Sequence, residues 1–227
     1  ELSEMNTLNI VNAAMPEKLL MLCAKFAPIK EYSDGCTIHN RGEIKPGLSI
    51  IYCGQVKIGN YGLDGKYQHM ATLMKADTFG EFTLFNSLPR THHAMAVGAT
   101  KVIQMSVNQF SQCSKGTPEL SAFLLSSMGL KLHIALERLD DIQRLPTYIR
   151  LAKVLLQHTD KQGQVVLRQK DLAEQLGITV LCCHKSIKKL AALSLIETFY
   201  GAIHIKNMTD FTRWLEEKMS LGQLLKS

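Results

Sequence analysis

The order of elements predicted between residues 166 and 206 constrains the fold of this chain more than any other feature. Asp171 is expected to begin a helix, because Leu172 and Leu176 lie four residues apart and share one helical face. Gly177 can take the positive φ that ends a helix at little cost. The pattern therefore predicts a first helix that stops at a tight turn.

A second helix and a short hairpin follow that turn. Thr179 is a favourable N-cap, and Cys183, Ile187 and Leu190 recur at helical spacing as an apolar stripe. The other face carries the basic residues His184, Lys185, Lys188 and Lys189. Strand-like runs at 196–199 and 202–205 flank Tyr200 and Gly201, a plausible hairpin turn. Helix, turn, helix and hairpin in this order predict a winged helix-turn-helix, which fits the DNA major groove. The alternative is an ordinary helical hairpin with a solvated basic face.

The distribution of charge favours the first interpretation. The chain has a formal net charge of +6, with 26 Lys and Arg residues against 20 Asp and Glu. Residues 146–227 hold 12 of these cations against 7 acids, so that a net of +5 lies in the segment with the predicted helix-turn-helix. Pairing of cations with phosphates supplies most non-specific affinity for DNA. Double-stranded DNA is therefore the expected partner.

Composition excludes several other classes of protein. The 227 residues are 46% hydrophobic and 20% charged, which is typical of a globular chain of one or two domains. We expect no transmembrane helix and no signal peptide, and therefore no membrane partner and a cytoplasmic location. The six cysteines include no CxxC pair, and no Cys/His spacing matches a zinc site, so no metal ligand is predicted.

Residues 28 to about 110 change to a strand-like period. Short apolar runs alternate with turn signals, among them Asp34-Gly35, Pro46-Gly47, Cys53-Gly54 and Asp64-Gly65. The expected strands cover 49–53, 55–59, 68–73 and 102–106. Many short strands at this spacing predict an antiparallel sandwich or roll.

A helical period returns after Pro118. Apolar residues spaced 3, 4, 3, 4 and 3 apart form an unbroken seam, which consists of Leu125, Met128, Leu132, Ala135, Leu139 and Ile142. We interpret this seam as the interface of a parallel homodimer, because Phe123, Leu130 and Ile134 offer a second apolar face to the roll. The alternative is that the seam packs on its own domain. Dimerisation would place two recognition helices in successive major grooves about 34 Å apart.

These patterns predict an α+β chain with three parts. Residues 1–118 form an antiparallel, jelly-roll-like β-roll sensor domain preceded by a helix within residues 1–27. Residues 119–145 form a long dimerisation helix. Residues 146–227 form the winged helix-turn-helix domain, which starts with an amphipathic helix over 147–158 and ends with a helix over 208–227 that packs through Phe211, Trp214 and Leu215.

The roll segment carries a more specific signal. Residues 79–95, FGEFTLFNSLPRTHHAM, resemble the phosphate-binding cassette of cyclic-nucleotide-binding domains. Residues 42–58, GEIKPGLSIIYCGQVKI, resemble the glycine-punctuated strands of that domain, and TKVIQMSVNQF at 100–110 resembles its closing strand. Together with the long helix and the winged helix-turn-helix, the chain resembles the bacterial cyclic-AMP receptor protein/fumarate-nitrate regulator family of transcription factors. This resemblance implies a homodimeric regulator, not an enzyme, whose roll senses a small effector such as cyclic AMP or cyclic GMP and repositions the recognition helices. RNA polymerase is a further partner that it implies.

The resemblance also implies an effector site. Gly80 would let the backbone approach a phosphate, Arg90 would pair with phosphate oxygens, and Glu81 would accept a ribose hydroxyl. The full predicted set is Gly80, Glu81, Phe82, Arg90, Thr91, Ala135 and Leu136. The alternative is that Glu81 and Arg90 pair with each other and brace the roll.

Two features of this chain depart from the family pattern at that site. Ala135 and Leu136 stand where cyclic-AMP-responsive members present hydroxyl groups to the base, and His92 and His93 replace small residues after the arginine. An unpaired base edge would cost about 1–3 kcal/mol.

The recognition helix departs from the family pattern as well. The predicted DNA-binding residues are Gln169, Thr179, Val180, Leu181, Cys183, His184, Lys185 and Lys188. Val180 and Leu181 replace an arginine and a glutamate that read bases in familiar members, and they could instead touch thymine methyl groups. Lys185 could read guanine, while Gln169 and Lys188 are assigned to phosphates. We therefore expect an operator unlike the usual one, or alternatively a domain that has lost specific reading.

Three other hypotheses remain. A redox or gas sensor of the same fold would use cysteines or histidines, namely Cys23, Cys36, Cys53, Cys113, His39, His69, His92 and His93, although the cysteine spacings do not resemble iron–sulfur motifs. A cupin-like metal enzyme would need His-x-His, whereas only adjacent His92 and His93 occur. The pair Cys182-Cys183 could act as an oxidation switch, although Cys183 lies on the core-facing stripe.

Overall fold

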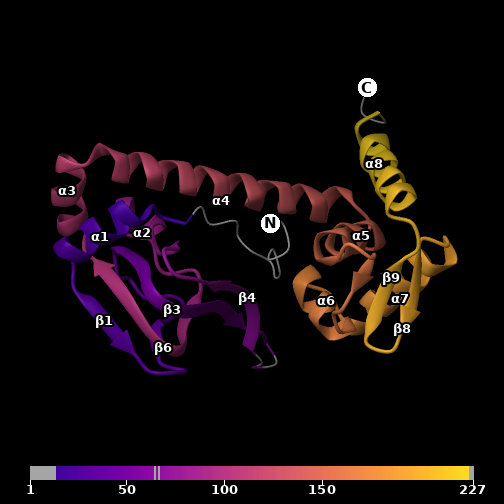
Figure 1. Ribbon diagram of the computed structural model, residues 1–227, viewed down its shortest axis with the longest axis horizontal. Helices are drawn as coiled ribbons and strands as arrows, with labels where there is room; N and C mark the ends of the chain where they lie inside the picture. The colour runs from indigo at the N-terminus through magenta and orange to yellow at the C-terminus, as the bar shows by residue number, and fades with distance from the viewer. Residues whose placement is uncertain (1–13, 64, 66, 225–227) are drawn as a thin grey trace. The chain divides into compact units, whose positions relative to one another are not determined.

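A computed structural model of the chain describes residues 14–63, 65 and 67–224, and residues 1–13 of the predicted first helix lie outside this description. The described chain separates into two compact units, one over residues 14–134 and the other over residues 135–224. Figure 1 shows the elements of each unit. The N-terminal unit holds the sheet of the roll, and the C-terminal unit holds a bundle of helices with a small sheet.

The sheet of the N-terminal unit is antiparallel throughout, as predicted. Its strands are β1 (Ile29–Tyr32), β2 (Thr37–His39), β3 (Leu48–Tyr61), β4 (Tyr67–Leu73), β5 (Thr78–Phe79) and β6 (His93–Met105). The strands run in the order β1-β6-β3-β4, with β2 paired to β6 and β5 paired to β3. The two long strands β3 and β6 therefore form the centre of the sheet, and each shorter strand pairs with one of them.

Strand β3 joins two runs that were expected to be separate. Gly54 was predicted to be a turn, but it lies inside β3, where the register with β6 shifts. Its φ is +84°, and a Cβ atom there would lie 2.6 Å from the carbonyl oxygen of Ala99. A glycine therefore permits a bulge that bends the strand without interrupting it.

Side chains on the two faces of this sheet build two cores. The inner face of the roll buries an apolar cluster that includes Ile51, Val56 and Phe79. The outer face packs on helices α1 (Glu17–Phe26), α3 (Val107–Gly116) and the start of α4 (Pro118–Arg144), with Ile50 and Ile103 fully buried. Alternation along β3 explains the division, because neighbouring strand residues point to opposite faces.

Helix α3 was not predicted, although the sequence carries a signal for it. Ser106 caps the helix by accepting a hydrogen bond from the backbone N–H of Gln109, and the Gln109 side chain accepts one from the Ser106 N–H. This is a capping box.

Helix α4 presents two apolar stripes. Leu120, Leu124 and Ser127 are buried in the N-terminal unit, with Phe123 partly buried beside them. The predicted seam lies largely on the exposed surface, with Leu125 74% exposed and Leu132 57% exposed. By length and composition alone α4 is apolar enough to cross a membrane, and these two stripes account for that hydropathy.

The C-terminal unit contains the winged helix-turn-helix. Its elements are α5 (Thr147–His158), β7 (Gln164–Val165), α6 (Gln169–Leu176), α7 (Val180–Ala192), β8 (Ile196–Phe199), β9 (Ala202–Ile205) and α8 (Met208–Leu224). Both strands of the wing have the predicted bounds, and β7, which was not predicted, adds a third strand to that sheet. The core contains Leu151, Leu172, Ile187 and Phe211.

Local chemistry fixes the turn between α6 and α7. Gly177 has φ +64°, and the hydroxyl of Thr179 accepts a hydrogen bond from the Cys182 N–H at 3.2 Å, both as predicted. Helix α6 begins two residues before the predicted start, at Gln169. Asp171 lies in its first turn, where the carboxylate accepts hydrogen bonds from the Arg168 guanidinium. This ion pair lowers the pKa of Asp171.

Candidate effector and DNA-binding sites

The predicted cassette brings Gly80, Glu81 and Arg90 together between β5 and β6. Gly80 has φ +77°, a conformation that favours glycine. The guanidinium of Arg90 lies directly against the backbone of Gly80. A Cβ atom at this position would lie 1.3 Å from Arg90 Nη1. The glycine is therefore required both for the turn and for the close approach of the arginine. The helix that follows, α2 (Phe82–Phe85), has only four residues.

Glu81 is held by a lysine from α4 that sequence reasoning missed. Lys131 Nζ lies 2.5 Å from Glu81 Oε1, with the side chains 9% and 1% exposed respectively. Lys131 also donates to the carbonyl oxygen of Thr78 at 3.0 Å. The second carboxylate oxygen, Glu81 Oε2, is buried without a hydrogen-bond partner among the described residues. A buried ion pair thus fixes the carboxylate and leaves one acceptor unused.

Arg90 has a complementary set of unused donors. Its Nη2 donates to the carbonyl oxygens of Lys45 at 2.8 Å and Gly47 at 3.4 Å. The residue is only 5% exposed, yet Nε and Nη1 have no partner within the described chain. Burial lowers the pKa of Arg90, an effect that the charges of Glu81 and Glu43 oppose. Unpaired buried donors are costly, so this geometry favours an anion that would satisfy them.

The alternative in which Glu81 and Arg90 brace the roll by pairing directly does not describe this site. Glu81 forms its ion pair with Lys131, and Arg90 donates to backbone carbonyls. Thr83, a further residue that the sequence did not reveal, ties the cassette to the loop at 45–47. Its hydroxyl accepts a hydrogen bond from the Gly47 N–H, and its one hydrogen lies within reach of Gly80 O at 2.9 Å and Gly47 O at 3.2 Å.

The remaining predicted effector residues are less enclosed. Phe82 and Thr91 are exposed, and the Thr91 hydroxyl lies 2.8 Å from His92 Nδ1. Ala135 and Leu136 belong to the C-terminal unit, and both are exposed on α4. Burial, with the charge of Arg41, lowers the pKa of His92. The roles of these four predicted residues in effector binding stay predictions.

Most of the predicted DNA-binding residues, at the start of α6 and on the predicted recognition helix α7 with its N-cap, are exposed to solvent. Those that are exposed are Gln169, Thr179, Val180, Leu181, Lys185 and Lys188, and His184 is half-buried. Cys183 is the exception, because its side chain is 0% exposed in the core of the unit. The prediction that Cys183 contacts DNA was therefore wrong, since the residue lies on the inward stripe with Ile187 and Leu190.

Lys189, one of the four basic residues on that face, has a structural contact. Its ammonium lies 3.8 Å from the centroid of the Tyr148 ring on α5. This distance is that of a cation–π interaction, which helps to fix α7 against α5. Lys185 and Lys188 are thus the exposed lysines of α7 that remain available to DNA.

The sulfur and imidazole groups are dispersed in the described chain. None of the six cysteines forms a disulfide, and no group of three or more His, Cys, Asp or Glu side chains is placed to hold a metal ion among the described residues. Cys23 and Cys113 lie close together, and burial with the influence of Cys113 raises the pKa of Cys23 to about 12. Burial, with Cys182 nearby, also raises the pKa of Cys183 to about 11. A high thiol pKa disfavours the reactive thiolate, which weakens the oxidation-switch interpretation at Cys183.

In the described chain a β-roll with a buried cassette is followed by the long helix α4 and a winged helix-turn-helix. Residues 29–116 match the family model of the cyclic nucleotide-binding domain. A CRP-like cAMP-activated global transcriptional regulator from Mycobacterium tuberculosis is 26% identical over 191 residues, which cover 80% of this chain and 85% of the relative.

Solved structures agree in fold. CprK complexed with OCPA gives a TM-score of 0.70 at 14% identity, with 91% of this chain and 99% of that chain covered. The c-di-GMP responsive global regulator CLP from Xanthomonas campestris gives a TM-score of 0.66 at 15% identity, with 85% and 100% covered. Over most of its length the chain is thus similar to a transcription regulator, and its roll matches the family model of the cyclic nucleotide-binding domain.

Proposed function

We propose that this protein is a homodimeric transcription regulator whose DNA affinity is set by a cyclic nucleotide bound at the Gly80–Thr91 cassette. It acts by binding rather than by catalysis, and it acts in the cytoplasm. The observation that carries the proposal is the set of buried, unpartnered polar atoms in the cassette, namely Arg90 Nε, Arg90 Nη1 and Glu81 Oε2.

These atoms match the chemistry of a cyclic nucleotide. A phosphate diester anion would accept hydrogen bonds from the two free Arg90 nitrogens, and a ribose hydroxyl would donate to Glu81 Oε2. Binding would then relieve the cost of leaving these groups unpaired. Because Lys131 on α4 already holds Glu81 Oε1, a change at Glu81 would reach α4 directly.

Exposed apolar residues on α4 support a dimer. Leu125, Leu132, Leu139 and Ile142 are all more than half exposed, and they recur at the spacing of a coiled-coil seam. A second copy of the same helix would cover them, since a seam of this kind is self-complementary about a two-fold axis. The homodimer interface is therefore assigned to the seam of Leu125, Met128, Leu132, Ala135, Leu139 and Ile142.

DNA reading is assigned to the exposed face of α7 with the wing beside it. Val180 and Leu181 at its N-terminal end would meet thymine methyl groups, and Lys185 would meet guanine. Gln169 and Lys188 would contact phosphates, and contact with RNA polymerase would follow from the regulator's position on DNA.

DNA binding is tested by selecting sequences from a random duplex library and then measuring their affinity by fluorescence anisotropy across a salt series. Lys188→Gln should weaken binding to all sequences alike and reduce the slope of log affinity against log salt concentration by about 1. Lys185→Gln should cost about 1–3 kcal/mol of binding free energy and relax the sequence preference at one base pair. Lys115→Gln in the N-terminal unit removes the same charge as a control and should leave both quantities unchanged. Binding that is insensitive to salt and to both α7 variants would reject the assignment.

Effector binding is tested separately by isothermal titration with cyclic AMP and cyclic GMP. We expect saturable binding of at least one nucleotide, and its loss in Arg90→Gln, which removes both free donors. Glu81→Gln, which keeps the shape, should weaken binding less. If neither nucleotide produces heat in a protein that still binds DNA, nucleotide binding at the cassette is rejected. The protein would then be a DNA-binding protein with another effector or with none.

A further inference from the structure

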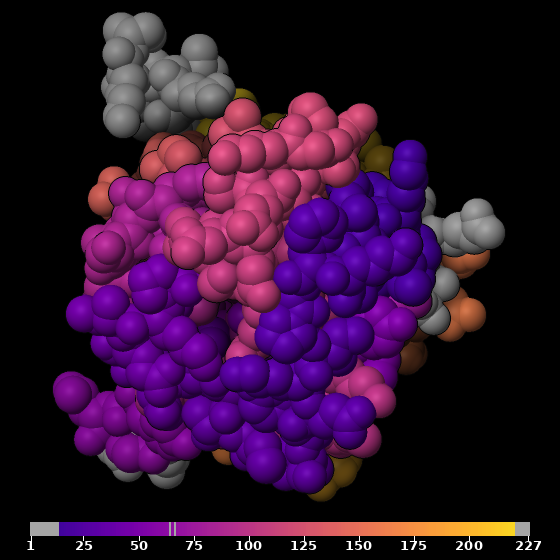
Figure 2. Space-filling view, turned by 90° about the vertical axis from the view of Figure 1, so that its left-hand side faces the viewer, coloured from indigo at the N-terminus to yellow at the C-terminus, as the bar shows by residue number. Residues whose placement is uncertain are grey.

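A second basic pocket lies at one end of the roll, on the inner face of the sheet. Figure 2 shows the surface of the N-terminal unit hollowed between its indigo N-terminal segments and the pink segment that follows β6. The lining comes from β1, β2, the loop before β3 with the start of β3, and the end of β6 with the start of α3, together with Arg90. None of the cassette's other predicted residues lines it.

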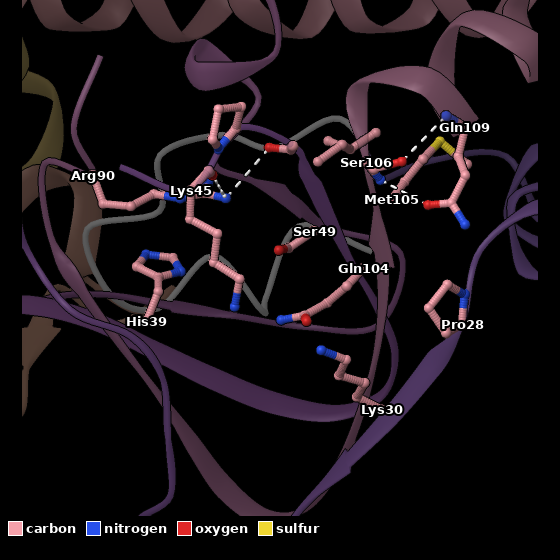
Figure 3. Close-up of a pocket in the computed structure, with 13 residues that line it drawn as sticks. Pro28, Lys30, His39, Lys45, Ser49, Arg90, Gln104, Met105, Ser106 and Gln109 are labelled. Carbon is pink, nitrogen blue, oxygen red and sulfur yellow. Dashed lines mark hydrogen bonds between the residues drawn. The ribbon is translucent and has the colours of Figure 1, made fainter. Parts of the chain in front are cut away.

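The charged side chains that line this pocket are all basic. The lining includes Lys30, Lys45 and Arg90 but no Asp or Glu side chain among its described residues. In Figure 3 the ammonium groups of Lys30 and Lys45 both point into the space beside Gln104. The nearby carboxylate of Glu43 accepts a hydrogen bond from Asn40 and does not line the pocket.

Several polar groups that line the pocket are buried, and two of the lining residues, Arg90 and Gln104, have unused hydrogen-bonding atoms. Ser49, His39 and Arg90 are each more than nine-tenths buried. Gln104 donates its amide N–H to the Tyr32 hydroxyl at 3.0 Å, which fixes the orientation of the amide, while Gln104 Oε1 is buried without a partner in the described chain. Arg90 Nε and Nη1 are likewise unpartnered. Such groups usually mark a missing water, ion or ligand.

We propose that this pocket binds a small oxyanion, of the phosphate or carboxylate class, at a site that adjoins the nucleotide cassette and shares only Arg90 with its predicted residues. Its volume of about 170 Å³ is below the roughly 300–1,000 Å³ of pockets for drug-sized ligands, so it suits a small ion better than a nucleotide. Two ammonium groups and a buried guanidinium would neutralise the anion. A protonated oxygen of the same anion could donate to Gln104 Oε1, which favours hydrogen phosphate or a hydroxy-acid over a fully deprotonated ion.

The loop at 45–47 connects this pocket to the cassette. Lys45 and Gly47 line the pocket, and their carbonyl oxygens accept hydrogen bonds from Arg90 and from the Thr83 hydroxyl. An anion held by Lys45 would therefore fix the loop that positions both cassette residues. The proposal requires a coupling between the two sites, which must be reciprocal.

The test is an isothermal titration of the full chain with inorganic phosphate at constant ionic strength and without DNA. We expect one saturable site per chain, weakened at least tenfold in the Lys30→Gln/Lys45→Gln double variant. Gln104→Glu places a negative charge in the pocket while keeping an acceptor for Tyr32, and it should abolish binding. Lys115→Gln serves as the charge-matched control and should bind as the unmodified protein does.

Each outcome decides the proposal independently of nucleotide binding. Saturable phosphate binding that is lost in Gln104→Glu and kept in Lys115→Gln supports it, whether or not cyclic AMP binds. Phosphate binding that survives in Gln104→Glu places the ion at the cassette instead and overturns it. No saturable binding of phosphate, and none of lactate as the hydroxy-acid probe, overturns it as well.

Discussion

The buried pair of Lys131 and Glu81 gives the sharpest energetic prediction. Lys131→Met would leave the Glu81 carboxylate buried and without the cation that it now faces at 2.5 Å. Breaking a buried ion pair from one side costs about 3–5 kcal/mol, because the remaining charge stays desolvated. We therefore expect the free energy of unfolding of the N-terminal unit to fall by that amount.

A double-mutant cycle separates this cause from a simple loss of packing. In Lys131→Met/Glu81→Leu both charges are absent, so the double variant should be more stable than Lys131→Met alone. Recovery should be partial, because the charge of Glu81 also favours the buried cation of Arg90.

Urea denaturation followed by far-ultraviolet circular dichroism measures each corner of the cycle. Fluorescence of Trp214, the single tryptophan of the chain, follows the C-terminal unit in parallel. The electrostatic explanation would be refuted if the double variant lost as much free energy of unfolding as the two single variants together, within about 0.5 kcal/mol.

Burial, reinforced by the charge of Arg90, lowers the pKa of His39 to about 4 from 6.5, so the unfolded state binds a proton that the folded state does not. Stability should therefore fall by about 3 kcal/mol as pH drops from 6.5 to 4, and His39→Gln should show less of this loss in pH-dependent urea melts. Gly80→Ala introduces a Cβ atom 1.3 Å from Arg90 Nη1 at φ +77°, and it should cost more than the roughly 1–2 kcal/mol of the backbone conformation alone. Unchanged nucleotide affinity in that variant would contradict the placement of Arg90. On the seam, Leu132→Glu and Leu139→Glu should each raise the dimer dissociation constant by at least about tenfold, since burying one leucine contributes about 1.5–3 kcal/mol. Sedimentation equilibrium measures this, and a mass that stays dimeric at all concentrations would place the interface elsewhere.

Local chemistry explains which parts of the fold the sequence could predict. The turn at Gly177, the cap at Thr179 and both strands of the wing depend on residues within a few positions of one another, and all were correctly predicted. Gly80 was placed in the cassette by the resemblance of its segment, and its positive φ was not predicted. Helix α3 was missed even though Ser106 and Gln109 form a capping box, because the strand-like pattern before them was extended too far.

Contacts between distant residues explain what could not be predicted. Lys131 and Glu81 lie 50 positions apart, and neither periodicity nor motif spacing marks them as partners. The hydrogen bonds of Thr83 to the loop at 45–47 are equally non-local. Cys183 was assigned to DNA from the family pattern, although it also lies on the apolar stripe of its helix, and a rotation of about 100° per residue turns it into the core.

Control of DNA binding by the cassette is the central property proposed for this protein. The decisive measurement is the affinity for a selected duplex, by fluorescence anisotropy, with and without saturating cyclic AMP or cyclic GMP, for the unmodified protein and for Arg90→Gln. We predict that at least one nucleotide changes the affinity of the unmodified protein and that Arg90→Gln binds DNA without responding. DNA binding that neither nucleotide alters, or a response that persists in Arg90→Gln, would contradict the account.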